Sequence, residues 1–71
     1  MKYIVMEIQT DSEERVANVV TQHDTLAAAE SAYYAILSAA AISQVPVHSA
    51  VLLTNEGISL LFNSFTHGGE A

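Results

Sequence analysis

The segment 45–65, which reads VPVHSAVLLTNEGISLLFNSF, constrains the fold more than any other part of the chain. Two runs rich in Val, Leu, Ile and Phe flank the sequence Asn55-Glu56-Gly57. This pattern predicts a β-hairpin with a three-residue loop. The last residue of such a loop typically has a positive φ, which glycine adopts without a Cβ clash. We therefore expect Gly57 to close the hairpin.

Both faces of this predicted hairpin are apolar. A three-residue loop places Thr54 opposite Ile58, and side chains alternate along each strand. One face then holds the pairs Leu52–Leu60, Ala50–Phe62 and His48–Ser64, and the outer face holds Val47, Val51, Leu53, Leu61 and Phe65. A hairpin with one solvated face alternates apolar and polar residues, so the outer face of this one needs a cover. We expect a second copy of the chain to provide it; the alternative is a monomer with an exposed apolar patch, which is uncommon at this size.

Length and composition favour the same interpretation. The 71 residues are sufficient for a single domain, 1–71. A domain of this size buries only about 60% of its unfolded surface and is marginally stable alone. There is no cysteine, which excludes disulfides and thiolate metal sites, and homo-oligomerisation is the remaining common source of stability.

The charge balance excludes nucleic acid as a partner. The net charge is −6, and the only basic residues are Lys2 and Arg15. A protein that binds DNA or RNA needs a basic patch that replaces phosphate counterions. The N-terminal apolar run is too short for a signal peptide and is interrupted by Glu7, and no stretch reaches about 18 apolar residues. We expect a cytosolic protein without membrane contact.

Two further strands are predicted before a single helix. The first, at 2–9, has an apolar face made of Ile4, Met6 and Ile8, and a polar turn separates it from the second, at 16–22. The second strand is short and rather polar, which is typical of an edge strand.

An Ala-rich helix follows, from about residue 25 to residue 43. Asp24 or Thr25 is expected to cap it, and Pro46 marks its end. Its core stripe is predicted to be Leu26, Ala29, Tyr33, Ile36, Leu37 and Ala40. The polar tail 66–71 is expected to fray.

The element order is therefore ββαββ, an α+β fold. We predict a four-stranded antiparallel sheet in the order 2-1-3-4, with the helix on one face. The strands at the centre are then the first and third, which are the more apolar ones, and the crossover is right-handed.

The sequence contains no catalytic or metal-binding motif, and we expect a non-enzymatic protein without cofactor. Among the three histidines, His48 lies in a predicted strand, where it is either a histidine satisfied by backbone or water, or a ligand contact. Tyr34 lies off the core stripe of the helix, and is either an interface anchor or an exposed stacking surface.

The stretch AESAYYAILSAAAISQVPVHSAVLLTNEG, preceded by KYIVMEIQT, resembles a group of small uncharacterised proteins from phages and mobile elements of Gram-positive gut bacteria. The most specific part is VPVHSAVLL followed by the turn at Glu56-Gly57. Members of that group carry a Lys and a His in the helix where this chain has Ala32 and Tyr34. The resemblance implies a phage or prophage origin and no particular activity.

Two classes of function are open at this point. The first is a homo-oligomeric phage accessory protein that sequesters a small nucleotide-like signal of bacterial immunity at a site between subunits. Its expected ligand-binding residues are Arg15, Tyr34, His48, Thr66 and His67. The acidic balance argues against an anionic ligand. The second class is a structural, assembly or protein-interaction module that acts through its apolar sheet face.

Overall fold

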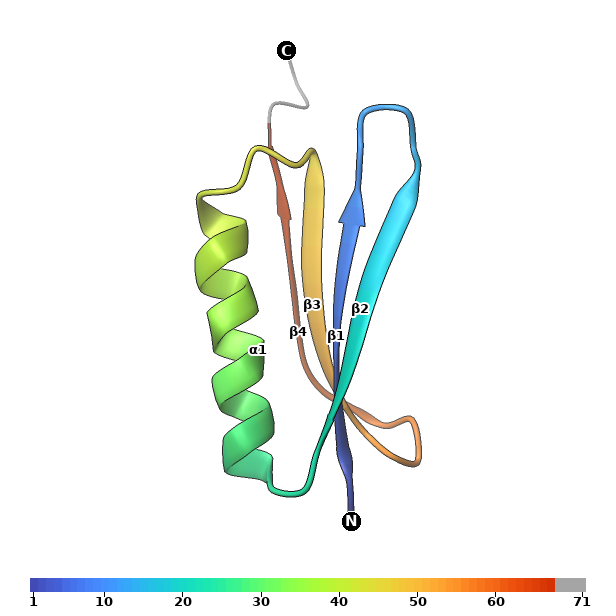
Figure 1. Ribbon diagram of the computed structural model, residues 1–71, viewed down its shortest axis with the longest axis vertical. Helices are drawn as coiled ribbons and strands as arrows, with labels where there is room; N and C mark the ends of the chain where they lie inside the picture. Colours follow the sequence, from blue (N-terminus) through green and yellow to red (C-terminus); the bar gives the residue numbers. More distant parts are fainter. Residues whose placement is uncertain (68–71) are drawn as a thin grey trace.

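Four strands and one helix make up the computed structural model, which describes residues 1–67 (Figure 1). The elements are β1 (Tyr3–Thr10), β2 (Val16–His23), α1 (Leu26–Ala41), β3 (Val47–Thr54) and β4 (Ser59–Thr66). The strands form one antiparallel sheet in the order β2-β1-β3-β4. The predicted fold class and strand order are confirmed.

The hairpin of β1 and β2 is regular along its whole length. All eight residues of β1 have a partner in β2, from the pair Tyr3–His23 to the pair Thr10–Val16. Asp11 shapes the connecting turn, because its side chain accepts hydrogen bonds from the backbone N–H groups of Glu13 and Arg15. β2 forms one edge of the sheet, as its polar sequence indicated.

The hairpin of β3 and β4 has the predicted loop. The N–H of Thr54 donates to the carbonyl of Ile58, and Gly57 has a φ of +86°. Such a φ lies in the left-handed region, which favours glycine.

The predicted register of this hairpin is wrong beyond the loop. β4 contains one extra residue, Leu60, so that Leu53 pairs with Ser59 whereas Leu52 pairs with Leu61. This β-bulge moves every later residue of β4 to the other face of the sheet. The observed pairs are Ala50–Asn63, Val51–Phe62, Ser49–Ser64 and His48–Phe65, so Leu61 and Phe65 share the helix-side face, and Phe62 the outer face.

The helix begins at Thr25, one of the two predicted caps, whose hydroxyl accepts a hydrogen bond from the N–H of Ala28. It packs mainly on the central strands β3 and β1, on one side of the sheet (Figure 1). The fully or nearly buried apolar side chains between these layers are Val5, Ala29, Tyr33, Ala50 and Leu52. Of the predicted stripe, Ile36 and Leu37 are partly buried and Leu26 is exposed.

The polar tail starts later than expected. Thr66 is the last residue of β4, and the backbone N–H of His67 donates to the carbonyl of Pro46. The rest of the predicted tail, 68–71, lies outside the described residues.

Candidate functional site: the outer face of the sheet

The face of the sheet opposite α1 carries a continuous apolar row. Met6 on β1 pairs with Val20 on β2 and with Val51 on β3, and Val51 in turn pairs with Phe62 on β4. Directly opposed residues lie on the same face of a sheet, about 5 Å apart. These four side chains therefore cross the whole sheet near the middle of its strands.

The other positions on this face are filled by apolar and uncharged polar residues. Following the alternation of the paired strands, the outer face holds Ile4, Ile8, Thr10, Val16, Asn18, Gln22, Val47, Ser49, Leu53, Ser59, Ser64 and Thr66 in addition to the apolar row. None of these residues is ionisable. Seven of them are hydroxyl or amide residues, and Ser49 donates a hydrogen bond across the face to Ser64 (3.0 Å). We call this uncharged surface the outer face.

The outer face is open in the single chain. Phe62 is 65% exposed and Val20 is 54% exposed at the two ends of the apolar row. A continuous apolar row with exposed ends marks an interaction surface more often than a solvated one.

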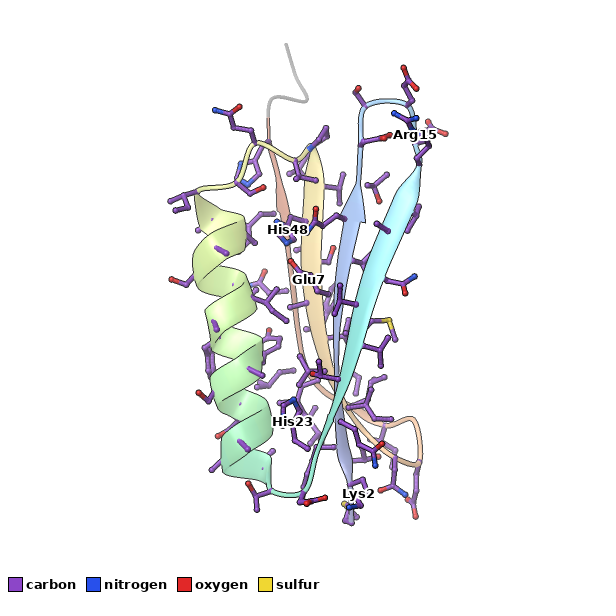
Figure 2. The ribbon with its side chains drawn as sticks, viewed as in Figure 1. Lys2, Glu7, Arg15, His23 and His48 are labelled. Atoms are coloured by element: carbon purple, nitrogen blue, oxygen red, sulfur yellow. The ribbon has the colours of Figure 1, made fainter. Side chains whose placement is uncertain are left out.

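A polar cluster lies on the other side of the sheet, beneath the helix (Figure 2). His48 is only 4% exposed, and its Nε2 lies 2.6 Å from Oε2 of Glu7. The amide of Gln9 donates to the same carboxylate oxygen over 3.0 Å. Nδ1 of His48 has no hydrogen-bond partner within the described part of the chain. This cluster links β3 to β1, because His48 lies on β3 and its partner Glu7 lies on β1.

The cluster does not provide a nucleophile and base. Ser49 follows His48 in the chain, but alternation places its side chain on the outer face, away from the imidazole. His48 is also closed off from solvent.

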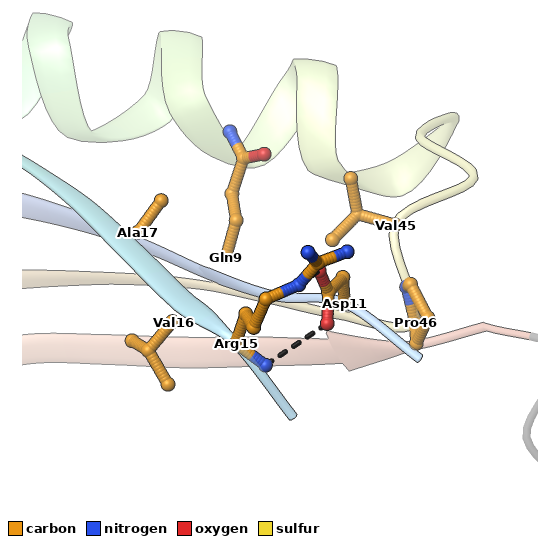
Figure 3. Close-up of a pocket in the computed structure, with 7 residues that line it drawn as sticks. All are labelled: Gln9, Asp11, Arg15, Val16, Ala17, Val45 and Pro46. Atoms are coloured by element: carbon orange, nitrogen blue, oxygen red, sulfur yellow. Dashed lines mark hydrogen bonds and ion pairs between the residues drawn. The ribbon is translucent and has the colours of Figure 1, made fainter. Parts of the chain in front are cut away.

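A pocket of about 290 Å³ lies beside the β1–β2 turn (Figure 3). Its lining comes from the ends of β1 and β2 and from the segment before β3: Gln9, Asp11, Arg15, Val16, Ala17, Val45 and Pro46. Its size is near the lower limit for small-molecule sites.

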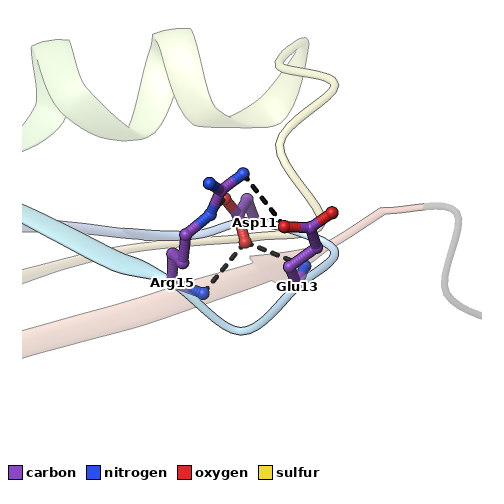
Figure 4. A network of polar contacts seen from close by, with 3 residues as sticks. All are labelled: Asp11, Glu13 and Arg15. Carbon is purple, nitrogen blue, oxygen red and sulfur yellow. Dashed lines mark hydrogen bonds and ion pairs between the residues drawn. The ribbon is translucent and has the colours of Figure 1, made fainter.

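The one guanidinium at this pocket is already paired with carboxylates (Figure 4). Nε of Arg15 lies 2.8 Å from Asp11, and a terminal nitrogen lies 3.3 Å from Glu13. Hydrogen bonds from the backbone and side chain of Arg15, together with one from the backbone of Glu13, lower the pKa of Asp11, so this carboxylate stays ionised at neutral pH. A phosphate at this pocket would therefore compete with two carboxylates for Arg15.

The five expected ligand residues do not form one site. Arg15 lies at the β1–β2 turn, and Tyr34 lies on the helix, 54% exposed and edge-to-face with core residue Tyr33. His48 is buried, and Thr66 is on the outer face at the end of β4. His67 contacts the end of the helix, with Nε2 2.7 Å from the carbonyl oxygen of Ala40.

Sequence reasoning missed Glu7 and Gln9 as partners of His48, and it placed Phe62 on the wrong face. Glu7 and Gln9 alternate with apolar residues in the first strand, and this pattern was the available signal for polar partners of His48.

Among residues 1–67, no group of three or more His, Asp or Glu side chains is arranged to hold a metal ion. Within the same residues, no helix is long and apolar enough to cross a membrane.

No family model, no curated protein and no solved structure matches this chain.

Proposed function

We propose that the protein is a non-enzymatic interaction module that acts through the outer face of its sheet. The observation that carries this proposal is the outer face itself, an uncharged surface whose central apolar row crosses all four strands. The polar cluster around His48 supports a structural role for the opposite side, because it is covered by the helix. The phage origin implied by the sequence resemblance remains a prediction.

Site-specific photo-crosslinking tests this function. A benzophenone amino acid replaces Phe62, on the outer face, in the full chain produced in living cells. Tyr34 is the matched control position, because it is also aromatic and is exposed to a similar degree, but lies on the helix. We expect discrete crosslinked products from position 62 and none from position 34. Absence of crosslinks from position 62 would refute the proposal.

Sequestration of a nucleotide-like ligand is a second candidate, favoured by the pocket beside Arg15. The pairing of Arg15 with two carboxylates makes it the weaker of the two. Calorimetry of the full chain against cyclic and ADP-ribose-type nucleotides tests it, with Arg15→Gln as the variant. Heat that is lost in the variant supports ligand binding at this pocket, and no heat from any of these nucleotides contradicts it.

A further inference from the structure

We infer that the occupant of the outer face is a second copy of the same chain, packed sheet against sheet with the two helices outside. This inference rests on the proposed function and names the partner of that same surface. Three properties of the described residues carry it: the placement of charge, the area of the outer face and the small size of the core.

Charge is excluded from the outer face although the chain as a whole is strongly acidic. The net charge is −6, and the acidic side chains of the described residues lie in the turns, in the helix and its approach, or beneath the helix. Two copies that meet through their outer faces therefore bring no like charges into the interface. A partner recognised through opposite charge would find no ionic group on this surface.

The area is sufficient for a specific dimer. Four strands of eight residues cover about 27 Å by about 19 Å, or about 500 Å² of projected surface per copy. Two copies together bury about 1,000 Å² by this measure, which is the lower limit for a specific protein interface. The side chains add relief to this projected area, so the buried accessible surface is larger.

The core of one copy is too small to stabilise the domain well. Among residues 1–67, only Leu52 and Val5 are large side chains that are fully buried. On the other side of the sheet, Met6 and Val51 are partly exposed although they lie on the two central strands. A second sheet at about 10 Å would convert these side chains into a second core. Oligomerisation is a common source of stability for domains of this size.

The size of the end residues indicates how the copies are oriented. The apolar row ends in a large side chain, Phe62, and in a small one, Val20. A two-fold axis parallel to the strands places Phe62 of each copy over Val20 of the other, which keeps the sheets evenly spaced. An axis perpendicular to the strands within the interface would stack Phe62 on Phe62 and leave a gap between the two Val20 side chains. Close packing favours the first arrangement.

Sedimentation equilibrium of the full chain tests the second copy. We expect twice the 7.6 kDa mass of one chain. Phe62→Glu should dissociate the dimer or unfold it, because a buried unpaired carboxylate is strongly unfavourable. Tyr34→Glu, an equally new charge on the helix, should leave the mass at the dimer value. A chain that sediments as a monomer at every concentration, or a Phe62→Glu variant that remains dimeric, would overturn the inference.

The crosslinking experiment separates failure of this inference from failure of the proposed function. If position 62 crosslinks a different protein and the pure chain is a monomer, the second copy is refuted and the interaction function stands. If position 62 crosslinks nothing, both are refuted.

Mixing two variants tests the orientation of the copies. Phe62→Glu and Val20→Lys should each dissociate alone. An equimolar mixture should restore the dimer mass. In the mixed dimer the new carboxylate at position 62 of one copy faces the new ammonium at position 20 of the other. The second contact, between Val20 of the first copy and Phe62 of the other, is unchanged. If the axis were perpendicular to the strands, the two new charges would not meet, and the mixture would stay dissociated. A dissociated mixture would therefore refute the proposed orientation.

Discussion

At the scale of single residues, the contact between His48 and Glu7 is the most buried of the contacts between acidic and basic side chains within residues 1–67. The side chain of His48 is 5% exposed and that of Glu7 is 21% exposed, with 2.6 Å between Nε2 and Oε2. Loss of one partner leaves the other poorly solvated, whereas loss of both removes the demand for a hydrogen bond. The pair therefore contributes specificity to the pairing of β1 with β3 as much as stability.

A double-mutant cycle measures this pair. We expect His48→Leu to lower the free energy of unfolding by about 1–3 kcal/mol, because the poorly solvated Glu7 carboxylate then keeps only the Gln9 amide as a hydrogen-bond partner. The double variant Glu7→Leu/His48→Leu should lose less than the sum of the two single variants, since two apolar side chains need no polar partner. Urea unfolding of the four proteins gives the comparison. Additive losses would show that the two side chains act independently.

Asp11 contributes a pH-dependent part of the stability of the β1–β2 turn. Its hydrogen bonds with the backbone of Arg15, the backbone of Glu13 and the side chain of Arg15 lower its pKa in the folded state below the ordinary value of 3.8. A lowered pKa means that this stabilisation is complete above 3.8 and is lost as the pH falls through the folded value. Asn at this position keeps an acceptor but not the charge.

Asp11→Asn should therefore melt at a lower temperature than the unmutated chain at pH 7, and the difference should disappear as the pH falls below 3.8. Melting curves across this pH range measure it. Glu14→Gln is the control, because it removes one charge from the same turn at a carboxylate that makes no hydrogen bond or ion pair with the rest of residues 1–67. An equal pH-dependent difference in both variants would mean that net charge, not the turn contacts, causes the effect.

The residue scale also shows where sequence reasoning reached its limit. His48 stood out as a histidine within an apolar strand, but its partner comes from a strand 41 positions earlier. Glu7 and Gln9 meet His48 only because β1 lies beside β3 in one specific register. Local patterns predict that the strand exists, and its register depends on the packing of the whole sheet.

At the scale of elements, the start of the helix offers a clean comparison between two neighbouring residues. Thr25 accepts a hydrogen bond from the N–H of Ala28, whereas Asp24 forms an ion pair with Lys2. Both partners of that ion pair are more than half exposed at the side chain. Exposed ion pairs contribute little to stability, and helix caps contribute more.

Thr25→Ala should accordingly lower the free energy of unfolding by about 1 kcal/mol, since it removes the cap. Asp24→Ala should have a smaller effect, because it removes an exposed ion pair only. Urea unfolding followed by circular dichroism measures both. An equal or larger loss in Asp24→Ala would show that the ion pair, and not the cap, holds the start of the helix.

The elements themselves were predictable because each has a local cause. Gly57 marks the second loop, Thr25 the start of the helix, and alternating Ile4, Met6 and Ile8 the first strand. The bulge at Leu60 has no such local mark, because the extra residue lies in an apolar run that reads equally well in either register. The prediction therefore had Val51 on the correct face and its neighbours on β4 on the wrong one.

At the scale of the whole molecule, the bulge determines what the outer face presents. Without the extra residue, Leu61 would lie outside and Phe62 beneath the helix; with it, Phe62 completes the apolar row next to Val51. The face thus gains a large aromatic side chain at the β4 edge, opposite the smaller Val20 at the β2 edge. The shape of the proposed dimer interface follows from this single insertion.

The salt dependence of association follows from the position of the charges. Each copy carries a net charge of −6, so dimerisation brings two like-charged molecules together. Since the outer face contains no ionisable side chain, no ion pair across the interface is available to be screened. Added salt should then only weaken the repulsion between the copies, because the Debye length falls to about 10 Å at 0.1 M ionic strength.

We therefore expect the melting temperature of the unmutated chain to rise with protein concentration, as it does when the native state is an oligomer. The dissociation constant, measured by sedimentation, should fall as sodium chloride is raised. If Phe62→Glu stays folded as a monomer, its melting temperature should not depend on protein concentration, and its mass in sedimentation should not depend on salt. This variant is therefore the control for effects of salt on the single domain. Dissociation promoted by salt would indicate ion pairs across the interface, which a sheet-to-sheet dimer through the uncharged outer face does not have.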